Sequence, residues 1–404
     1  MSGALEDIRV FDLSRILAGP ACTQILGDLG AEVIKVERPG VGDDTRKWGP
    51  PYLKDADGRE TTESAYYLAI NRNKRSITLD ITKPEGQELA LRLIEHCDVL
   101  IENFKVGDLA RRGLGYEQLR ERFPRLIYCS ITGFGQTGPY KDRPGYDYMA
   151  QAMGGIMSVT GDADGSPMKV GVGIADIMTG MYATSAILAA IHHRTVTGKG
   201  QYIDMALLDS QVAWLSSSGQ NYLTSREPVP RFGNAHPNIV PYQVFPSADG
   251  HVVIAAGNDA QFRRLCDFAN LPELADDERF ATNAARIRNR DALIPLIEDA
   301  VVRHPSAHWL EGLEGVKVPA CPINTIAQVF ADPQVRHRGM EIALTHPESA
   351  AATPLIASPI KMSDTPPEYR RAPPTLGQHT DEVLGEMLGL GADEVAALRD
   401  DGVV

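Results

Sequence analysis

Residues 8–37 read IRVFDLSRILAGPACTQILGDLGAEVIKVE and contain one complete strand–helix–strand unit. Residues 8–13 are rich in β-branched and aromatic side chains and predict a strand, and residues 32–37 predict a second one. Between them, Pro20 suits the first turn of a helix and Gly30 suits its end. This order is typical of a parallel α/β sheet. No G-x-G-x-x-G motif follows the first strand, which argues against a nicotinamide-dependent dehydrogenase.

The alternation of strands and helices continues along the chain. Further strands are predicted at residues 75–80, 98–104, 126–132 and 201–206, and further helices at residues 84–96, 116–123 and 207–222. This order predicts a doubly wound, Rossmann-like parallel sheet, which binds its ligand at the carboxyl ends of the strands.

The length predicts more than one domain, because 404 residues exceed the usual size of a single core. We predict a large α/β domain over residues 1–224 and a smaller α+β domain over residues 225–325, which contains a β-hairpin. Residues 326–404 are predicted to return to the large domain, with terminal helices that start near Thr380 and Ala392.

The composition is that of a soluble globular protein, with 43% hydrophobic and 23% charged residues. A net charge of −13 argues against a nucleic-acid partner. No apolar run is expected to reach membrane-spanning length, and the first residues, MSGALED, lack the pattern of a signal peptide. The five cysteines show no CxxC spacing, so we expect reduced thiols, a cytoplasmic location and no metal site.

The segment VGVGIADIMTG, residues 170–180, places one carboxylate, Asp176, before a long apolar run at helical spacing. An Asp in this position is commonly a helix cap. The alternative is a nucleophile, because Gly171 and Gly173 allow a ligand to approach the backbone and a helix N-terminus stabilises a carboxylate. The local sequence is compatible with both interpretations.

Several segments together resemble the class III coenzyme A transferases, the family that includes formyl-CoA transferase and the carnitine and bile-acid CoA-transferases. They occur in the family's order along nearly the whole chain. The matching segments read FDLSRILAGPACTQ, GAEVIKVERPG, NRNKRSITLD, DVLIENF, ITGFGQTGP, RPGYD, ADIMTGM, TGKGQYIDM and PTLGQHTDEVL.

The resemblance implies that Asp176 is the nucleophilic aspartate. It also implies a coenzyme A site that comprises Ile16, Leu17, Arg38, Leu79, Asn103, Phe104, Lys105, Arg111 and Tyr146. Arg38 and Arg111 would supply cations for the phosphates in an otherwise acidic protein. Leu79 and Phe104 would supply apolar surface for adenine or pantetheine.

The resemblance further implies an enzyme without a prosthetic group, whose substrates are acyl-CoA thioesters and small carboxylic acids. In the implied mechanism the Asp176 carboxylate forms first an anhydride with the donor acid and then a thioester with CoA. Backbone N–H groups of residues 133–138 or of Gly257 are candidates for the oxyanion site. An interlocked homodimer is implied as well. The connectors at residues 224–241 and 325–345 suit this topology, although ordinary linkers would look the same.

Two departures from the formyl-CoA transferases bear on the substrate. Their glycine-rich loop corresponds to AAGNDAQF at residues 255–262, which has a single glycine, and Leu17 stands where they carry glutamine. The chain is therefore closer to members that use succinyl-CoA and a dicarboxylic acid.

Two other functions are compatible with parts of the pattern. An α-methylacyl-CoA racemase would need a second acid/base, which racemases supply with a histidine, and Tyr146 occupies that position here. A CoA-binding protein without catalytic activity would not need Asp176.

Overall fold

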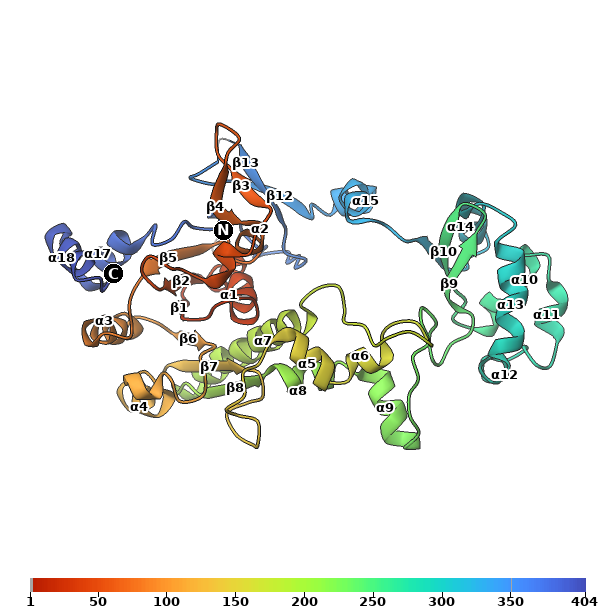
Figure 1. The fold of residues 1–404 in the computed structure, drawn as a ribbon, viewed down its shortest axis with the longest axis horizontal. Helices are drawn as coiled ribbons and strands as arrows, with labels where there is room; N and C mark the ends of the chain where they lie inside the picture. The colour runs from red at the N-terminus through yellow and green to blue at the C-terminus, as the bar shows by residue number, and fades with distance from the viewer. Residues whose placement is uncertain (1–2, 350) are drawn as a thin grey trace. The chain divides into compact units, whose positions relative to one another are not determined.

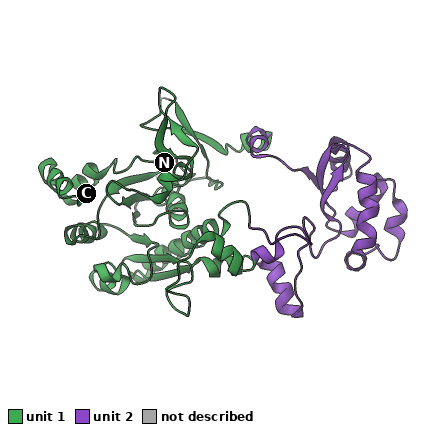
Figure 2. Ribbon diagram, viewed as in Figure 1, with its two compact units in different colours: residues 1–155, 170–214, 333–404 green, residues 156–169, 215–332 purple. Residues whose placement is uncertain are grey.

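The computed structural model describes residues 3–349 and 351–404. The chain forms two compact units, drawn in different colours in Figure 2. Unit 1 comprises residues 1–155, 170–214 and 333–404, and unit 2 comprises residues 156–169 and 215–332. The domain limits predicted at residues 224 and 325 stay a prediction.

Unit 1 is built on a six-stranded parallel sheet with the order β5-β2-β1-β6-β7-β8, which can be followed in Figure 1. The strands are β1 (Arg9–Asp12), β2 (Glu32–Glu37), β5 (Lys74–Thr78), β6 (Val99–Glu102), β7 (Ile127–Thr132) and β8 (Tyr202–Ala206). The chain adds strands outward from β1 on one side and then outward from β6 on the other. This is the Rossmann order, and the predicted fold class is confirmed.

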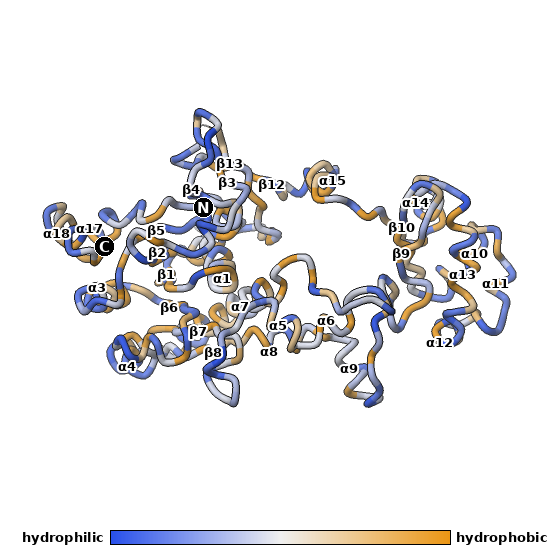
Figure 3. Tube along the Cα trace, in the orientation of Figure 1, coloured by the Kyte–Doolittle hydropathy of each residue, from blue (hydrophilic) through white to orange (hydrophobic). Residues whose placement is uncertain are grey.

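Successive side chains of each strand point to opposite faces of the sheet, and helices pack against both faces, so both are buried. On β1, Phe11 lies opposite Ile34 of β2 and Leu100 of β6, and these three side chains belong to one core cluster. Val10 and Val33 belong to a second cluster. Helices α1 (Ala18–Asp28) and α7 (Ile174–Thr197) contribute to the second cluster, and α3 (Pro84–Ile94), α4 (Tyr116–Arg122) and α17 (Thr380–Leu388) contribute to the first. Figure 3 shows α1 as largely apolar, whereas α3 and α4 carry more hydrophilic residues.

The remaining elements of unit 1 include two hairpins that the sequence did not predict. They are β3 (Tyr52–Lys54) with β4 (Glu60–Ser64), and β12 (Glu341–Thr345) with β13 (Ala352–Ile356). The other elements are η1 (Asp44–Lys47), α2 (Ala65–Ala69), η2 (Ala110–Arg112), α5 (Asp147–Met153), α8 (Leu207–Ala213), α16 (Pro333–His337) and α18 (Ala392–Asp400). The terminal helices α17 and α18 begin at Thr380 and Ala392, as predicted.

Unit 2 combines a three-stranded antiparallel sheet with helices. The predicted hairpin is β9 (Tyr242–Ser247) with β10 (Gly250–Ala255), and β11 (Ala320–Pro322) pairs with β10. Its helices are α6 (Ile156–Val159), α9 (Ser216–Ser225), α10 (Asp259–Phe268), α11 (Pro272–Asp276), α12 (Asn283–Arg288), α13 (Arg290–Val301), α14 (Ser306–Gly315) and α15 (Ile326–Ala331). Phe245, Phe262 and Trp309 are buried in its core. This unit therefore has its own hydrophobic core.

Helix α7 has 24 residues, and its most apolar part has a mean hydropathy of 1.5, so its length and composition alone would allow it to span a membrane. The expectation that no segment reaches this limit was therefore too strict. The helix packs against α1 and the sheet through residues such as Ala183 and Ile187. A core helix of a globular protein meets the same criterion, so the composition of α7 is weak evidence for a membrane span.

Candidate active site

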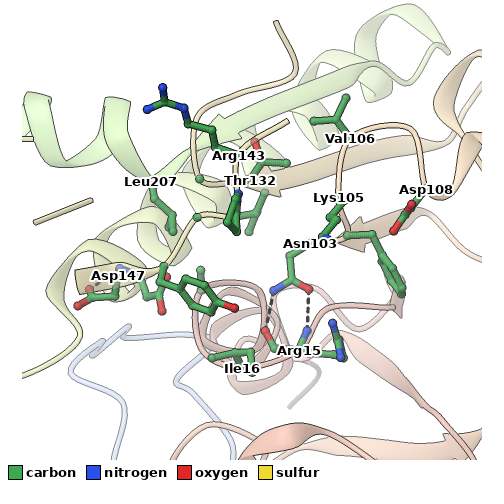
Figure 4. A pocket seen from close by; sticks show the side chains of 18 of the residues that line it. Arg15, Ile16, Asn103, Lys105, Val106, Asp108, Thr132, Arg143, Asp147 and Leu207 are labelled. Atoms are coloured by element: carbon green, nitrogen blue, oxygen red, sulfur yellow. Dashed lines mark hydrogen bonds between the residues drawn. The ribbon is translucent and has the colours of Figure 1, made fainter. Parts of the chain in front are cut away.

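A cavity of about 570 Å³ lies in unit 1, where the loops after β1, β6 and β7 meet. The chain reverses its direction of strand addition between β1 and β6, and ligands of doubly wound sheets bind at that point. The lining contains most of the residues predicted from the sequence, namely Asp176, Ile16, Leu17, Asn103, Phe104, Lys105, Arg111 and Tyr146. Figure 4 shows several of these side chains around the cavity.

Two of the predicted residues do not line this cavity. Leu79 follows β5, is 3% exposed and packs in the core beside the sheet, so its side chain does not form ligand-binding surface. Its backbone N–H donates to the carbonyl of Glu37. Arg38 follows β2 and is exposed. A contact of either residue with coenzyme A stays a prediction.

Asn103 uses its amide group to hold the turn that follows β1. Its Oδ1 accepts from the backbone N–H of Arg15 at 2.9 Å, and its Nδ2 donates to the Arg15 carbonyl at 2.7 Å (Figure 4). The next residue, Ile16, has φ 73°, which is unfavourable for a β-branched side chain. Its N–H lies 3.3 Å from both carboxylate oxygens of Asp43. Asn103 and Asp43 therefore hold a strained turn in the cavity wall.

We expect Asn103→Asp to weaken the binding of coenzyme A by about tenfold, because the aspartate cannot donate to the Arg15 carbonyl and that acceptor loses its partner. Isothermal titration with CoA measures this change. Asn270→Asp is the control, since it makes the same chemical change at an exposed position of unit 2. An affinity within twofold of the wild type in a folded Asn103→Asp variant would show that the turn does not depend on this pair.

The cavity gathers basic side chains in a protein whose net charge is −13. Arg15 pairs with Asp44 at 3.0 Å, and Arg111 pairs with Asp108. Three further cations line the cavity and form no ion pair within the described part of the chain, namely Lys105, Lys141 and Arg143. These three are the cations most available to a phosphate group.

Lys141 and Arg143 were not among the site residues predicted from the sequence. Their position in the sequence could have indicated them, because both follow the loop at residues 133–139, past the end of β7. Loops at the carboxyl ends of parallel strands face the ligand, and a basic residue there is informative in an acidic protein.

Asp176 is the third residue of α7, whereas the N-cap is Gly173 and has no side chain to close the helix end. The interpretation of Asp176 as a helix cap is therefore wrong. The capping oxygen comes from Asp147, whose Oδ1 accepts from the backbone N–H of Ala175 at 2.8 Å and of Asp176 at 3.2 Å. The Asp176 side chain is thus left to line the cavity.

Burial and the adjacent negative charge of Asp147 raise the pKa of Asp176 to about 7. A carboxyl group with this pKa is about half ionised at pH 7. Its anion is more basic than that of an ordinary aspartate, and basicity favours attack on a carbonyl carbon. Within the described residues, no group of three or more His, Cys, Asp and Glu side chains could hold a metal ion.

The family model for CoA-transferase family III matches residues 5–380. The chain belongs to CoA-transferase family III. It is 53% identical to the succinate–glutarate CoA-transferase of Agrobacterium fabrum over 95% of each chain, and 46% identical to the human succinyl-CoA:glutarate CoA-transferase over 99% of this chain and 90% of the human one. It is also 43% identical to the succinyl-CoA:mesaconate CoA-transferase of Haloarcula hispanica over 97% of this chain and 99% of that one.

Solved structures agree with this assignment. The crystal structure of a CAIB/BAIF family protein from Brucella suis superposes with a TM-score of 0.84 at 49% identity, over 96% of this chain and all of that one. Membership of the family confirms the recognised resemblance and makes the protein a class III CoA-transferase. Enzymes of this family use CoA thioesters as substrates, and the homologues named above act on dicarboxylic acids.

Proposed function

We propose that this family III CoA-transferase moves CoA from succinyl-CoA to a dicarboxylic acid such as glutarate through a covalent intermediate on Asp176. The observation that carries the proposal is the position of Asp176. This partly buried carboxylate with a pKa of about 7 lines the cavity where the order of strand addition reverses, together with three cations that form no ion pair with any residue the structure describes. The names of the relatives support the choice of succinyl-CoA and of a dicarboxylic acceptor.

The chemistry proceeds in two symmetrical halves. An Asp176 oxygen attacks the thioester carbon of succinyl-CoA, and the carbon–sulfur bond breaks to give an aspartyl–succinyl anhydride and CoA thiolate. The thiolate attacks the aspartyl carbon, which releases succinate and leaves an aspartyl-CoA thioester. The acceptor carboxylate attacks that thioester and expels the thiolate, which then attacks the acceptor carbon of the new anhydride and regenerates Asp176.

The protein's part in these steps is to hold CoA while the acids exchange. The cations that line the cavity would bind the phosphates of CoA, which keeps the thiolate close to the anhydride. Three of the candidate oxyanion donors are already occupied, and one of them is the N–H of Gln136, which donates to Asp204 Oδ2 at 3.1 Å. The N–H of Gly135 donates to Thr132 Oγ1 at 2.9 Å, and the N–H of Gly257 donates to Gln261 Oε1 at 2.8 Å. Gly133 lines the cavity and is the better candidate.

The proposal is tested by incubating the enzyme with succinyl-CoA and one acid at a time, and by following new CoA esters by liquid chromatography and mass spectrometry. We expect esters of glutarate or of other four- and five-carbon dicarboxylic acids, and little product from formate or oxalate. Failure of every acid to accept CoA would contradict the proposal. Exchange of the α-proton of a 2-methylacyl-CoA in deuterated water, without transfer, would favour the racemase instead.

The interlocked homodimer and the cytoplasmic location stay predictions. Light scattering of the purified protein measures the first, and a molar mass of one chain would contradict it.

A further inference from the structure

We propose that Asp147 and Gln151 act as a positioning pair that fixes the segment before α7 and so sets where the Asp176 carboxylate enters the cavity. This inference rests on the proposed function, because it assigns to the pair a task that matters only if Asp176 is the nucleophile. Asp147, Gln151 and residues 170–176 all belong to unit 1.

The segment at residues 170–173 would have little rigidity by itself. It reads VGVG, and its two glycines lose more conformational freedom on ordering than other residues. It ends at Gly173, the N-cap of α7, which has no side chain to accept from the first N–H groups of the helix. A segment of this kind needs partners from elsewhere to place the following turn.

Gln151 supplies the partners of the segment. Its side chain is fully buried, its Oε1 accepts from the backbone N–H of Val170 at 2.9 Å, and its Nε2 lies 3.3 Å from the carbonyl of Val172. The amide thus contacts the backbone on both sides of Gly171, much as a neighbouring strand would.

Asp147 supplies the cap of α7. It begins α5, one helical turn before Gln151, so both side chains lie on the same face of that helix. Gln151 Nε2 donates to Asp147 Oδ2 at 2.7 Å, while Asp147 Oδ1 accepts from the N–H groups of Ala175 and Asp176. Every side-chain polar atom of Asp147 and Gln151 therefore forms a hydrogen bond, either with the backbone of residues 170–176 or with the other member of the pair.

The close packing of Gly173 supports this arrangement. A Cβ atom at Gly173 would lie 2.9 Å from Leu17 Cδ2 and 3.6 Å from Asp147 Cγ. The start of α7 is therefore pressed against both the turn after β1 and the capping carboxylate, and a shift of this segment would move Asp176 relative to the cavity wall.

The charge of Asp147 adds a second effect. The Asp147 carboxylate accepts from the N–H groups at the N-terminus of α7, where the helix dipole is positive, so these groups do not stabilise the Asp176 anion. It also places a negative charge beside Asp176, which disfavours ionisation of the nucleophile. A further titratable group that interacts with Asp176 is the phenol of Tyr66 on α2, where burial and the charges of Asp176, Asp147 and Asp43 raise the pKa to about 12. Tyr66 therefore stays protonated below pH 9, and Asp147 is the group whose removal changes the titration of Asp176.

Two variants separate the two effects. Gln151→Met removes the hydrogen bonds at nearly constant volume, and we expect kcat to fall about tenfold with a KM for succinyl-CoA within about twofold of the wild type. Asp147→Asn keeps an oxygen for the helix cap and removes the charge. It also replaces the acceptor of Gln151 Nε2 by an amide donor, so its kcat should fall as well, and the effect of the charge is read from the pH profile. The wild-type kcat/KM should fall about tenfold between pH 8 and pH 6, and that of Asp147→Asn only about twofold. Asp209→Asn, which removes an exposed carboxylate from the first turn of α8, should keep the wild-type profile.

Hydrogen exchange gives a readout that does not depend on turnover. In Gln151→Met we expect the amides of Val170 and Ala175 to exchange at least about tenfold faster than in the wild type. Wild-type exchange rates together with wild-type kcat in this variant would overturn the positioning role, and an unchanged pH profile in Asp147→Asn would overturn the role of the charge.

If the wild-type enzyme transfers no CoA, the proposed function fails, and the exchange rates still decide whether the pair holds the segment. If Gln151→Met does not fold, Gln151→Glu, which keeps the acceptor for Val170 and loses the donor to Asp147, takes its place in both assays.

Discussion

Asp176→Asn is expected to lower kcat for CoA transfer by at least about a thousandfold, because the amide is isosteric with the carboxylate but is not a nucleophile. The covalent route then has no substitute, since the adjacent carboxylate of Asp147 is committed to two backbone N–H groups and to Gln151. Intact-protein mass spectrometry after brief incubation with succinyl-CoA should show an adduct of acyl or CoA mass on the wild type, removed by hydroxylamine, and none on the variant. Asp164→Asn, at an exposed position of unit 2, is the control and should form the adduct normally.

The same substitution should make the folded protein more stable at alkaline pH. Because the pKa of Asp176 is raised in the folded state, ionisation is harder there than in the unfolded chain, so wild-type stability is lost as the pH rises toward and through about 7. Each tenfold change in proton affinity corresponds to about 1.4 kcal/mol, so the cost at pH 8 is at most about 4 kcal/mol, and less for a partly exposed carboxyl. Asp176→Asn should therefore melt at a higher temperature than the wild type at pH 8, and the difference should shrink at pH 5. A variant that retains both the adduct and the wild-type stability profile would remove Asp176 from the mechanism.

The sheet and its ligand-binding edge could be predicted from the sequence because the signals are local. Residues 32–37 are a strand in both the prediction and the structure, and the turns that follow β1 and β6 do meet at the cavity. Short hairpins gave no such signal: β3 has three residues, none of them buried, so no hydrophobic alternation marks it.

The finer geometry of the site depends on partners that are distant in the sequence. Asp147 caps α7 across 28 residues, and Asn103 holds Arg15 across 88, so neither role can be found from the spacing of residues along the chain. Leu79 shows the opposite case. A resemblance placed it in the site, whereas its side chain, one residue past the end of β5, packs in the same core cluster as Ile77. Its contact with coenzyme A stays a prediction.

The second large effect concerns stability and centres on Arg46, which belongs to η1 in the connection after β2 and is 6% exposed. Its guanidinium donates to both oxygens of Glu37 at 2.8 Å and to both oxygens of Glu63 at 2.7 and 2.8 Å. It also donates to the Tyr67 hydroxyl at 2.6 Å and to the Pro374 carbonyl at 3.1 Å. One side chain therefore joins β2, β4, α2 and the C-terminal segment.

The carboxylates beside Arg46 depend on it to different degrees. Although burial disfavours the charged form of Glu37, the hydrogen bonds and charge of Arg46 hold the pKa of this group below its ordinary value. Burial raises the pKa of Glu63 to about 7 even in the presence of Arg46. Without the arginine, both carboxylates would be buried and unpaired, and each would be ionised only at a cost to the folded state.

Arg46→Met is therefore expected to lower the free energy of unfolding by about 3–5 kcal/mol at pH 8, measured by chemical denaturation followed by circular dichroism. The loss should be smaller at pH 5, because protonation of Glu63 and Glu37 removes the unpaired charges. In the variant the pKa values of both carboxylates are raised in the folded state, so the loss of stability grows as the pH increases. The triple variant Arg46→Met, Glu37→Gln, Glu63→Gln should recover part of the loss, since it leaves no buried charge without a partner. Arg59→Met, which breaks an exposed pair with Asp57, should leave the free energy of unfolding unchanged. If Arg46→Met were as stable as Arg59→Met at pH 8, the buried network would contribute nothing to the stability of the fold.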